Sequence, residues 1–228
     1  MTTLSRTASL LAPLMLAPLM LVACGKKAAE PAPEPEPVVV AAPAPAAAPV
    51  AADPGAMTDA QRDTARKQAK LDFAIMEDKY INDARAQWAA TATASTSFDK
   101  GKSESNLPVN ATGAVDEKEW TNDQQNIGFD WIELGYAKPV NATEVRMVTT
   151  DRPALESLTK IELQDTDGKW NTVWSGVSEA KKDENGPRTW IVRTFEKTAY
   201  KVKAVKYTFA NNVANGYKTV EAAQLVGD

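Results

Sequence analysis

The stretch IELQDTDGKWNTVW, residues 161–174, decides the fold class of the chain. Apolar and polar residues alternate before its turn, and Trp170 and Trp174 keep the same period of two after it. This period is typical of half-buried β-strands. Asp167-Gly168 separates the two runs, and glycine supplies the positive φ of a tight turn. The stretch therefore predicts a β-hairpin. An EF-hand calcium loop is excluded, because that motif needs a glycine at its sixth position and an acid at its twelfth. Counted from Asp165, the glycine here is fourth and Gly176 is twelfth.

The period of two recurs on both sides of this hairpin, without intervening helices. Short strands of this kind predict an antiparallel sandwich or barrel, because half-buried strands in water need a second layer. A change of phase near Ala204-Val205 predicts a β-bulge. We expect the tryptophans that lie within strands to pack in the core. The further strand segments are 144–149, 200–203, 205–209 and 219–226, and the tryptophans are Trp131, Trp170, Trp174 and Trp190.

Residues 57–86 predict one amphipathic α-helix. Thr58-Asp59-Ala60-Gln61 reads as a capping box, and the helix should end near Asn82-Asp83. The balanced charges of the helix favour packing against the following domain, and contact with a partner or a membrane is the alternative. The expected apolar stripe is Ala65, Ala69, Phe73, Met76 and Tyr80, widened by Leu71 and Ile75.

Residues 1–23 predict a secretory signal peptide. They carry one charge, Arg6, and an apolar run that is shorter than the ~20 residues of a membrane span. The run ends in LVACG, residues 21–25, which resembles the lipobox of bacterial lipoproteins. We therefore expect Cys24 to carry the acyl chains, such as palmitate, of a membrane anchor. An ordinary secretory signal is the alternative.

Residues 24–56 predict a disordered tether behind the lipidated cysteine. Eight of the 14 prolines of the chain lie between Pro31 and Pro54, among alanine, valine and glutamate. Proline removes backbone donors and favours extended geometry in its predecessor, so neither a helix nor a sheet is expected. Such a stretch acts as a semi-rigid spacer of up to ~3 Å per residue.

The composition excludes several function classes. The chain has 26 basic and 30 acidic residues and a net charge of −4, so no basic surplus is left for nucleic acid. It has no histidine, which excludes Ser-His-Asp and Cys-His catalysis and histidine metal sites. Its one cysteine leaves no internal disulfide. No set of carboxylates stands out as a catalytic pair, so we expect a protein that is not an enzyme and has no cofactor.

A series of motifs runs in order through residues 87–228. They are QWAATATAS (87–95), NATGAVD (110–116) with Trp120, DWIELGY (130–136), Pro139-Val140, Val145-Arg146-Met147, Ile161-Glu162-Leu163, Gly168-Lys169-Trp170, VWSG (173–176), Phe195, VKAV (202–205) and EAAQLVG (221–227). In this order they resemble the discoidin-like domains of the coagulation-factor C-type family. The resemblance implies an all-β jelly-roll β-sandwich of eight strands and of the galactose-binding type, here preceded by one α-helix and a disordered linker.

The resemblance also implies a binding role. Such domains bind sugars, lipids or proteins through loops at one end of the sandwich, and they rarely catalyse reactions. Sugar sites need aromatic platforms and planar polar groups, so Arg152, Asn212 and Tyr217 are candidate ligand residues. The family often carries a structural calcium in its first loop, which implies Asp116 as a metal ligand. Ala222 lies where the second acid is expected, beside Glu221, and this departure disfavours the metal.

These expectations combine into one functional prediction. The chain is expected to be a non-catalytic lipoprotein of the bacterial cell envelope whose loops bind carbohydrate. Gly25 after the cysteine, in place of an aspartate, favours the outer membrane. The alternative is a protein-interaction or envelope-assembly module that uses the same loops or the helix. The expected partners are the membrane, through the lipid, and either carbohydrate or an envelope protein.

Overall fold

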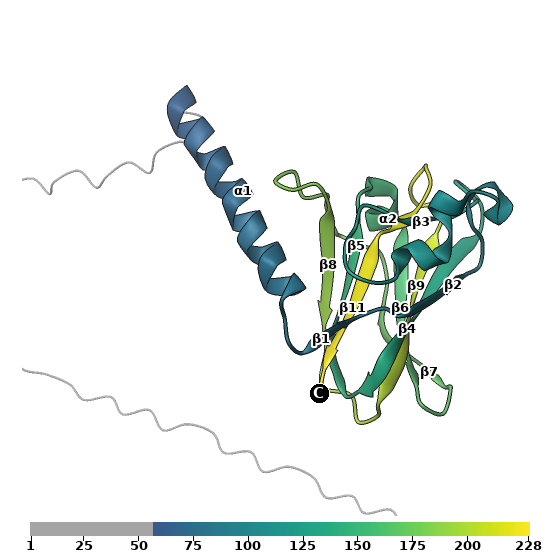
Figure 1. Cartoon of the computed structure of the whole chain (residues 1–228). Coiled ribbons are helices and arrows are strands. Elements are labelled where there is room, and N and C mark those ends of the chain that lie inside the picture. Colours follow the sequence, from purple (N-terminus) through teal and green to yellow (C-terminus); the bar gives the residue numbers. More distant parts are fainter. Residues whose placement is uncertain (1–56) are drawn as a thin grey trace, which may run out of the picture. The chain divides into compact units, whose positions relative to one another are not determined.

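The computed structural model describes residues 57–228, so the predicted signal peptide, Cys24 and the tether lie outside the described residues. One long helix, α1, precedes strands that pair antiparallel throughout (Figure 1). Within residues 57–228, none of the helices combines the length and the apolar character needed to cross a membrane. The elements are α1 (Asp59–Ile81), β1 (Ala86–Trp88), β2 (Thr91–Ala94), η2 (Phe98–Gly101), η3 (Glu104–Asn106), η4 (Pro108–Ala111), β3 (Trp120–Thr121), β4 (Phe129–Val140), β5 (Ala142–Thr149), α2 (Arg152–Ser157), β6 (Leu158–Asp165), β7 (Trp170–Ser175), β8 (Thr189–Thr194), β9 (Val202–Ala210), β10 (Thr219–Val220) and β11 (Ala222–Gly227).

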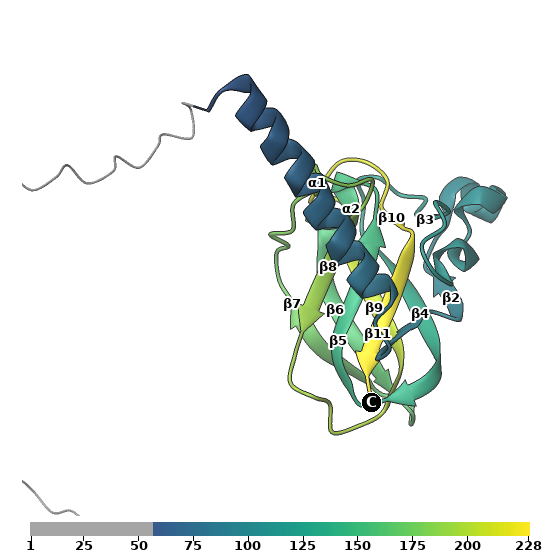
Figure 2. The ribbon, with the colours of Figure 1, turned by 60° about the vertical axis from the view of Figure 1, so that its left-hand side comes forward.

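The strands form two sheets that face each other (Figures 1 and 2). One sheet has the order β1-β11-β5-β8 and the other has the order β2-β4-β9-β6-β7. A short pair, β10-β3, lies at one end. This arrangement confirms the predicted β-sandwich, with nine strands in the two sheets where eight were expected.

The core lies between the sheets, and one prediction about it is wrong. The fully buried tryptophan is Trp120, whose indole N–H donates to the Thr96 carbonyl at 2.9 Å. Trp131 and Trp170 lie in strands, as expected, but on the outer face of the five-stranded sheet, where the Lys206 ammonium lies over both rings. Trp174 is half-buried and packs against the core, as expected, whereas Trp190 is half-buried against Tyr80 of the helix. An aromatic ring beside a lysine stem is shielded enough to stay at the surface.

Local sequence signals were reliable for the hairpin and approximate elsewhere. β6 and β7 meet at Asp165–Lys169, with Gly168 at a φ of 90°. The expected bulge lies at Lys203, because Val202 and Ala204 pair with the adjacent residues Asp165 and Gln164. The last strand is interrupted at Glu221, which separates β10 from β11.

Helix α1 begins with the predicted capping box of Thr58 and Gln61 and ends at its cap, Asn82. The expected width of the buried stripe is wrong, because Leu71 and Ile75 are 53% and 59% exposed. Phe73 is the fully buried residue of the helix, and Tyr80 packs on Trp190 with ring centroids 5.2 Å apart. Only the C-terminal half of the helix therefore packs on the sandwich, against the four-stranded sheet.

Two arginines fix this half of the helix. Arg146 lies on β5, is buried under the Tyr80 ring and pairs with Asp83 at 2.8 Å. Arg188 lies between Glu77 of the helix, at 3.4 Å, and Glu221 of the sandwich, at 2.5 Å. A buried guanidinium is tolerated when carboxylates and carbonyls satisfy its planar donors. The predicted packing of the helix against the domain is confirmed for these last turns.

Candidate functional site

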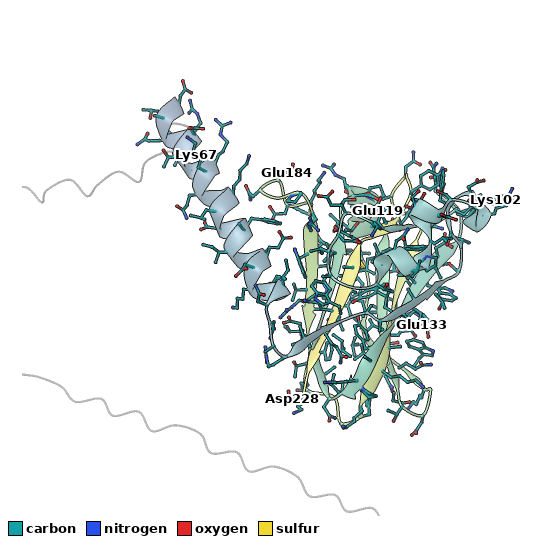
Figure 3. All side chains as sticks on the ribbon, in the orientation of Figure 1. Lys67, Lys102, Glu119, Glu133, Glu184 and Asp228 are labelled. Carbon is teal, nitrogen blue, oxygen red and sulfur yellow. The ribbon has the colours of Figure 1, made fainter. Side chains whose placement is uncertain are left out.

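The candidate site lies at the end of the sandwich from which its long loops emerge, called the loop end from here on. The loop end consists of residues 95–128, 150–157, 176–188 and 211–218. Figure 3 labels Glu119, Glu184 and Lys102 at this end, and Asp228 at the opposite end, where the turns are short. Because the strands alternate in direction, segments far apart in the sequence meet here.

A buried carboxylate, Asp130, joins the loop-end segments. Its Oδ1 accepts hydrogen bonds from the hydroxyls of Ser95 and Thr96 at 2.7 and 2.8 Å. Its Oδ2 accepts from the side-chain amides of Asn122 and Asn211, both at 2.8 Å. A carboxylate that accepts four such bonds holds three separate segments in one register.

The ionisation of Asp130 follows from these contacts. Burial by itself raises the pKa of the carboxyl, but the hydrogen bonds from Ser95, Asn211, Thr96 and Asn122 outweigh burial and leave the pKa below its usual value. The network is therefore ionised, and fully bonded, at neutral pH.

A buried lysine lies beside this network. The side chain of Lys218 is completely buried, and its Nζ donates to backbone carbonyls of both facing loops. The backbone N–H of Lys218 donates to Asn122 Oδ1 at 2.8 Å, which connects the lysine to the Asp130 network. Neither Asp130 nor Lys218 was among the residues predicted for the site.

Arg152 begins α2 and borders a hollow of about 340 Å³. The hollow lies between α2 and the β7–β8 loop, and its walls are strongly charged. Arg152 is exposed, and its guanidinium lies 3.9 Å from Glu156. The other lining residues are Ala180, Lys181, Lys182 and Glu184. These donors and acceptors suit a polar ligand.

Tyr217 and Asn212 lie on the loop between β9 and β10. The Tyr217 ring packs edge-on against Phe98, with centroids 5.1 Å apart. The loop contacts the start of α2, because a Cβ on Gly216 would lie 2.9 Å from the Pro153 ring. The Asn212 side chain is exposed and has no hydrogen bond within residues 57–228. The structure thus brings the three candidates to one end, but their side chains do not converge on one point.

A strained turn borders a second hollow at the loop end. Asp99, Lys100 and Gly101 all have left-handed backbone conformations, with φ of 51°, 54° and 75°. Such a conformation is costly for residues other than glycine and is concentrated at binding and catalytic sites. Lys100 and Gly101 line a hollow of about 400 Å³ together with Ala94, Ser95, Thr96, Ser97 and Asp123.

Exposed apolar side chains also lie at or next to the loop end. Phe129, at the first position of β4, is 67% exposed. Ile127 and Val213 are also more than half exposed on the two loops that meet at Lys218. Sequence reasoning missed Phe129, because an aromatic residue at the start of a β-strand cannot be distinguished by its pattern from one that packs in the core. Its position directly before the buried Asp130 is the signal that could have revealed it.

Asp116, the predicted metal ligand, is paired with a lysine. Its carboxylate pairs with Lys118 at 2.5 Å, and this hydrogen bond holds the pKa of Asp116 below its usual value. Glu221, the acid near the C-terminus, pairs with Arg188 instead. Nowhere in the described part of the chain do three histidine, cysteine, aspartate or glutamate side chains come together as a metal site would require. A calcium ion would have to compete with Lys118 and Arg188, so the residues do not fit it.

Asp151, the residue before α2, is an acid of the loop end whose pKa is raised. Burial raises the pKa of its carboxyl, hydrogen bonding by Thr219 and attraction to Lys218 oppose this, and the nearby Glu119 adds to it, so that the pKa is about 6.

Comparisons with known proteins give matches among solved structures alone. No protein-family model matches the chain, and no curated protein matches it. The CBM32-1 and CBM32-2 domains of Clostridium perfringens ZmpB match with a TM-score of 0.50 and 14% identity, over 68% of this chain and 38% of that one. The family 32 module of C. perfringens NanJ in complex with galactose matches with a TM-score of 0.45 and 13% identity, over 64% and 96%. A chitosan-binding module from Paenibacillus sp. IK-5 matches with a TM-score of 0.41 and 17% identity, over 60% and 94%.

At these identities the likeness concerns the fold. The match to the ZmpB domains confirms a jelly roll of the galactose-binding, discoidin-like type, as the motif order predicted. This chain spans well under half of the ZmpB structure, which contains two such domains.

Proposed function

We propose that this protein is a non-catalytic, carbohydrate-binding lipoprotein of the bacterial envelope, probing sugars with its loop end. Cys24 carries the lipid, residues 24–56 form the tether, and Gly25 directs the protein to the outer membrane. The ligand site is the surface between Arg152, Phe129 and Tyr217.

One observation carries the proposal: a highly exposed aromatic ring, Phe129, directly precedes the residue whose buried carboxylate joins the loop-end segments. A pyranose ring binds by stacking its C–H face on an aromatic ring while planar polar groups bind its hydroxyls. Phe129 is 67% exposed and precedes Asp130, whose four hydrogen bonds fix the backbone there. Such a platform needs little ordering on binding, which favours affinity for a small ligand.

The proposal assigns no bond-making step to the site. Two buried carboxylates beside the loops make structural contacts: Asp130 accepts from four donors, and Glu221 Oε1 accepts from Arg188 and the Glu117 N–H. A carboxylate used as general acid or base must face the ligand. Two of the matching solved structures are a carbohydrate-binding module in complex with galactose and a chitosan-binding module.

The test is direct binding by the full chain, purified in detergent. Titration calorimetry with neutral hexoses, N-acetylhexosamines and uronates would identify the ligand class. We expect Phe129→Ala to weaken binding of that ligand at least about tenfold, the loss of one stacking contact. Leu71→Ala, at an apolar residue of α1 that is 53% exposed, is the matched control and should bind as the wild type does. Absence of binding across all three sugar classes would contradict the proposal.

The anchor has its own measurement. Mass spectrometry of the mature N-terminus should find a diacylated or triacylated Cys24 as the first residue. A free Cys24 thiol behind an intact or differently cleaved signal would refute the lipoprotein part of the proposal and leave the binding part standing.

A second candidate function is favoured by the helix. Leu71 and Ile75 are one turn apart, and both are exposed on the face of α1 opposite the buried Phe73. Such a pair suits a protein partner of the envelope. A photo-cross-linker at Leu71 in intact cells would decide: one stoichiometric protein adduct favours the interaction module, and none favours the carbohydrate module alone.

A further inference from the structure

The ammonium group of Lys218 is enclosed like a bound metal ion. Its Nζ lies 2.6 Å from the Gln125 carbonyl oxygen, 3.0 Å from that of Asn211, 2.9 Å from that of Ala214 and 2.6 Å from that of Gly216. The residue is 0% exposed, so these oxygens replace the water shell of the charge. A lysine is almost never fully buried unless its charge is compensated.

The cage requires the charged form of the side chain. An ammonium has three N–H donors and no acceptor, whereas a neutral amine would turn a lone pair toward one of the carbonyls. Burial lowers the pKa of Lys218, and the carboxylates of Asp130 and Asp151 oppose this effect. The two negative charges, on β4 and on the residue before α2, therefore compensate the positive charge of the buried lysine.

The cage organises a loop that has little structure of its own. Residues 211–218 form turns and bends outside the sheets, and their carbonyls at Asn211, Ala214 and Gly216 all point at one nitrogen. Without that nitrogen these buried oxygens would be unsatisfied, which is costly. The fourth oxygen, that of Gln125, belongs to the loop that leads to Phe129. One ammonium thus holds together the two loops that present the candidate ligand residues.

We propose that Lys218 is a positioning residue whose ammonium acts as an internal cation of the carbohydrate site. It does not touch the ligand, but it fixes the loop of Asn212 and Tyr217 against the loop before Phe129. Truncation of its side chain leaves a carbonyl-lined site that takes a small primary ammonium ion. The positioning role rests on the proposed carbohydrate function, and the ammonium site does not.

The experiment is chemical rescue of Lys218→Ala in the full chain. The atoms removed beyond the β-carbon correspond to propylammonium. We expect the variant to melt at a lower temperature than the wild type and to bind the ligand at least about tenfold more weakly, because its loops are no longer preorganised. Propylammonium chloride should restore both quantities in a saturable manner. Tetramethylammonium, which has no N–H, and 1-propanol, which has no charge, should restore neither.

Lys206→Ala is the matched control. Lys206 also lies near the C-terminal part of the chain, but its ammonium packs 3.9 Å from the Trp170 ring centroid on an outer sheet face. No amine should rescue that variant. Equal rescue by tetramethylammonium, or no effect of propylammonium on the melting of Lys218→Ala, would overturn the proposal.

If Lys218→Ala does not fold, a measurement on the wild type tests the proposal instead. In ¹⁵N-lysine-labelled protein, the caged ammonium should give one ¹H–¹⁵N signal that exchanges slowly with water, because it is sealed by four carbonyls. If every lysine ammonium exchanges rapidly, the internal cation is wrong. Rescue of melting in a protein whose wild type binds no sugar would support the cation cage and contradict the carbohydrate function.

Discussion

Replacing Asp130 by alanine should destabilise the protein more than any other loop-end substitution. The change removes a buried carboxylate that accepts four hydrogen bonds of 2.7 to 2.8 Å. Asn122 and Asn211 each keep another carbonyl partner, and the two hydroxyls can rotate, so the bonds are not lost additively. Breaking such a buried charged network costs ~3–5 kcal/mol. For a chain of this size that corresponds to a melting temperature lower by about 10 °C.

Asp130→Asn sharpens the test. The asparagine can keep its carbonyl oxygen toward the two amides and turn its NH₂ toward the hydroxyls of Ser95 and Thr96, which can also accept. We expect a loss of ~1–2 kcal/mol for this variant, clearly less than for alanine. Urea unfolding followed by tryptophan fluorescence measures both values, with the exposed Val177→Ala as control. Equal losses for the two variants, or a loss below ~1 kcal/mol for alanine, would refute the network.

The pH dependence of this prediction has a fixed sign. The pKa of Asp130 is lowered in the folded protein, so its stabilising effect is present above the unfolded pKa of ~3.9 and is lost as the pH falls through the folded value. The difference in stability between the wild type and Asp130→Ala should therefore shrink in acid.

Three further predictions concern other parts of the described chain. Tyr80→Ala removes the contacts with Trp190 and Arg146 and should raise hydrogen exchange in the last turns of α1 while the sandwich amides stay protected, whereas exchange rising throughout would mean that helix and sandwich unfold as one unit. The folded pKa of Asp151, about 6, is above its unfolded value, so the wild type should lose stability as the pH rises from 4 to 6 and the carboxyl ionises. Asp151→Asn should remove about 1 kcal/mol of this loss, after solvent screening. An unchanged pH profile in urea unfolding would contradict this. Phe73→Ala should cost ~2–4 kcal/mol, and Leu71→Ala or Ile75→Ala less than ~0.5 kcal/mol, in the same assay; a cost at Leu71 equal to that at Phe73 would place the buried face of the helix elsewhere.

The elements with short-range causes could be predicted from the sequence. The hairpin at 161–174 follows from alternation and one glycine, and the start of α1 follows from Thr58 and Gln61, three residues apart. The motif order led to the correct fold type, because the order and spacing of the motifs reflect the whole sandwich. The two wrong expectations concern burial. Leu71 and Ile75 are exposed because they lie on the face of the helix opposite Phe73, and Trp131 and Trp170 face outward with Lys206.

The buried polar network could not be predicted, because its partners are distant in the chain. Asn122 and Asn211 are 89 positions apart, and Lys218 meets Gln125 over 93. Nothing local marks such residues, since a lysine or aspartate in a loop is usually solvated. The candidates Arg152, Asn212 and Tyr217 lie at the same end because loops at one end of an antiparallel sandwich share it. Which of them faces a ligand depends on side-chain packing, as the pairing of Tyr217 with Phe98 illustrates.

We propose that the loop end binds a sugar and that the Asp130 network and the Lys218 ammonium hold this end rigid. The most direct test is an NMR titration of the ¹⁵N-labelled full chain with the glycan that binds best in calorimetry. Saturable shifts are expected for the amides of Phe129, Arg152, Asn212 and Tyr217, and none for Trp170 at the opposite end of the five-stranded sheet or Leu71 on the helix. Shifts confined to the opposite end of the sandwich or to the helix would contradict the proposal.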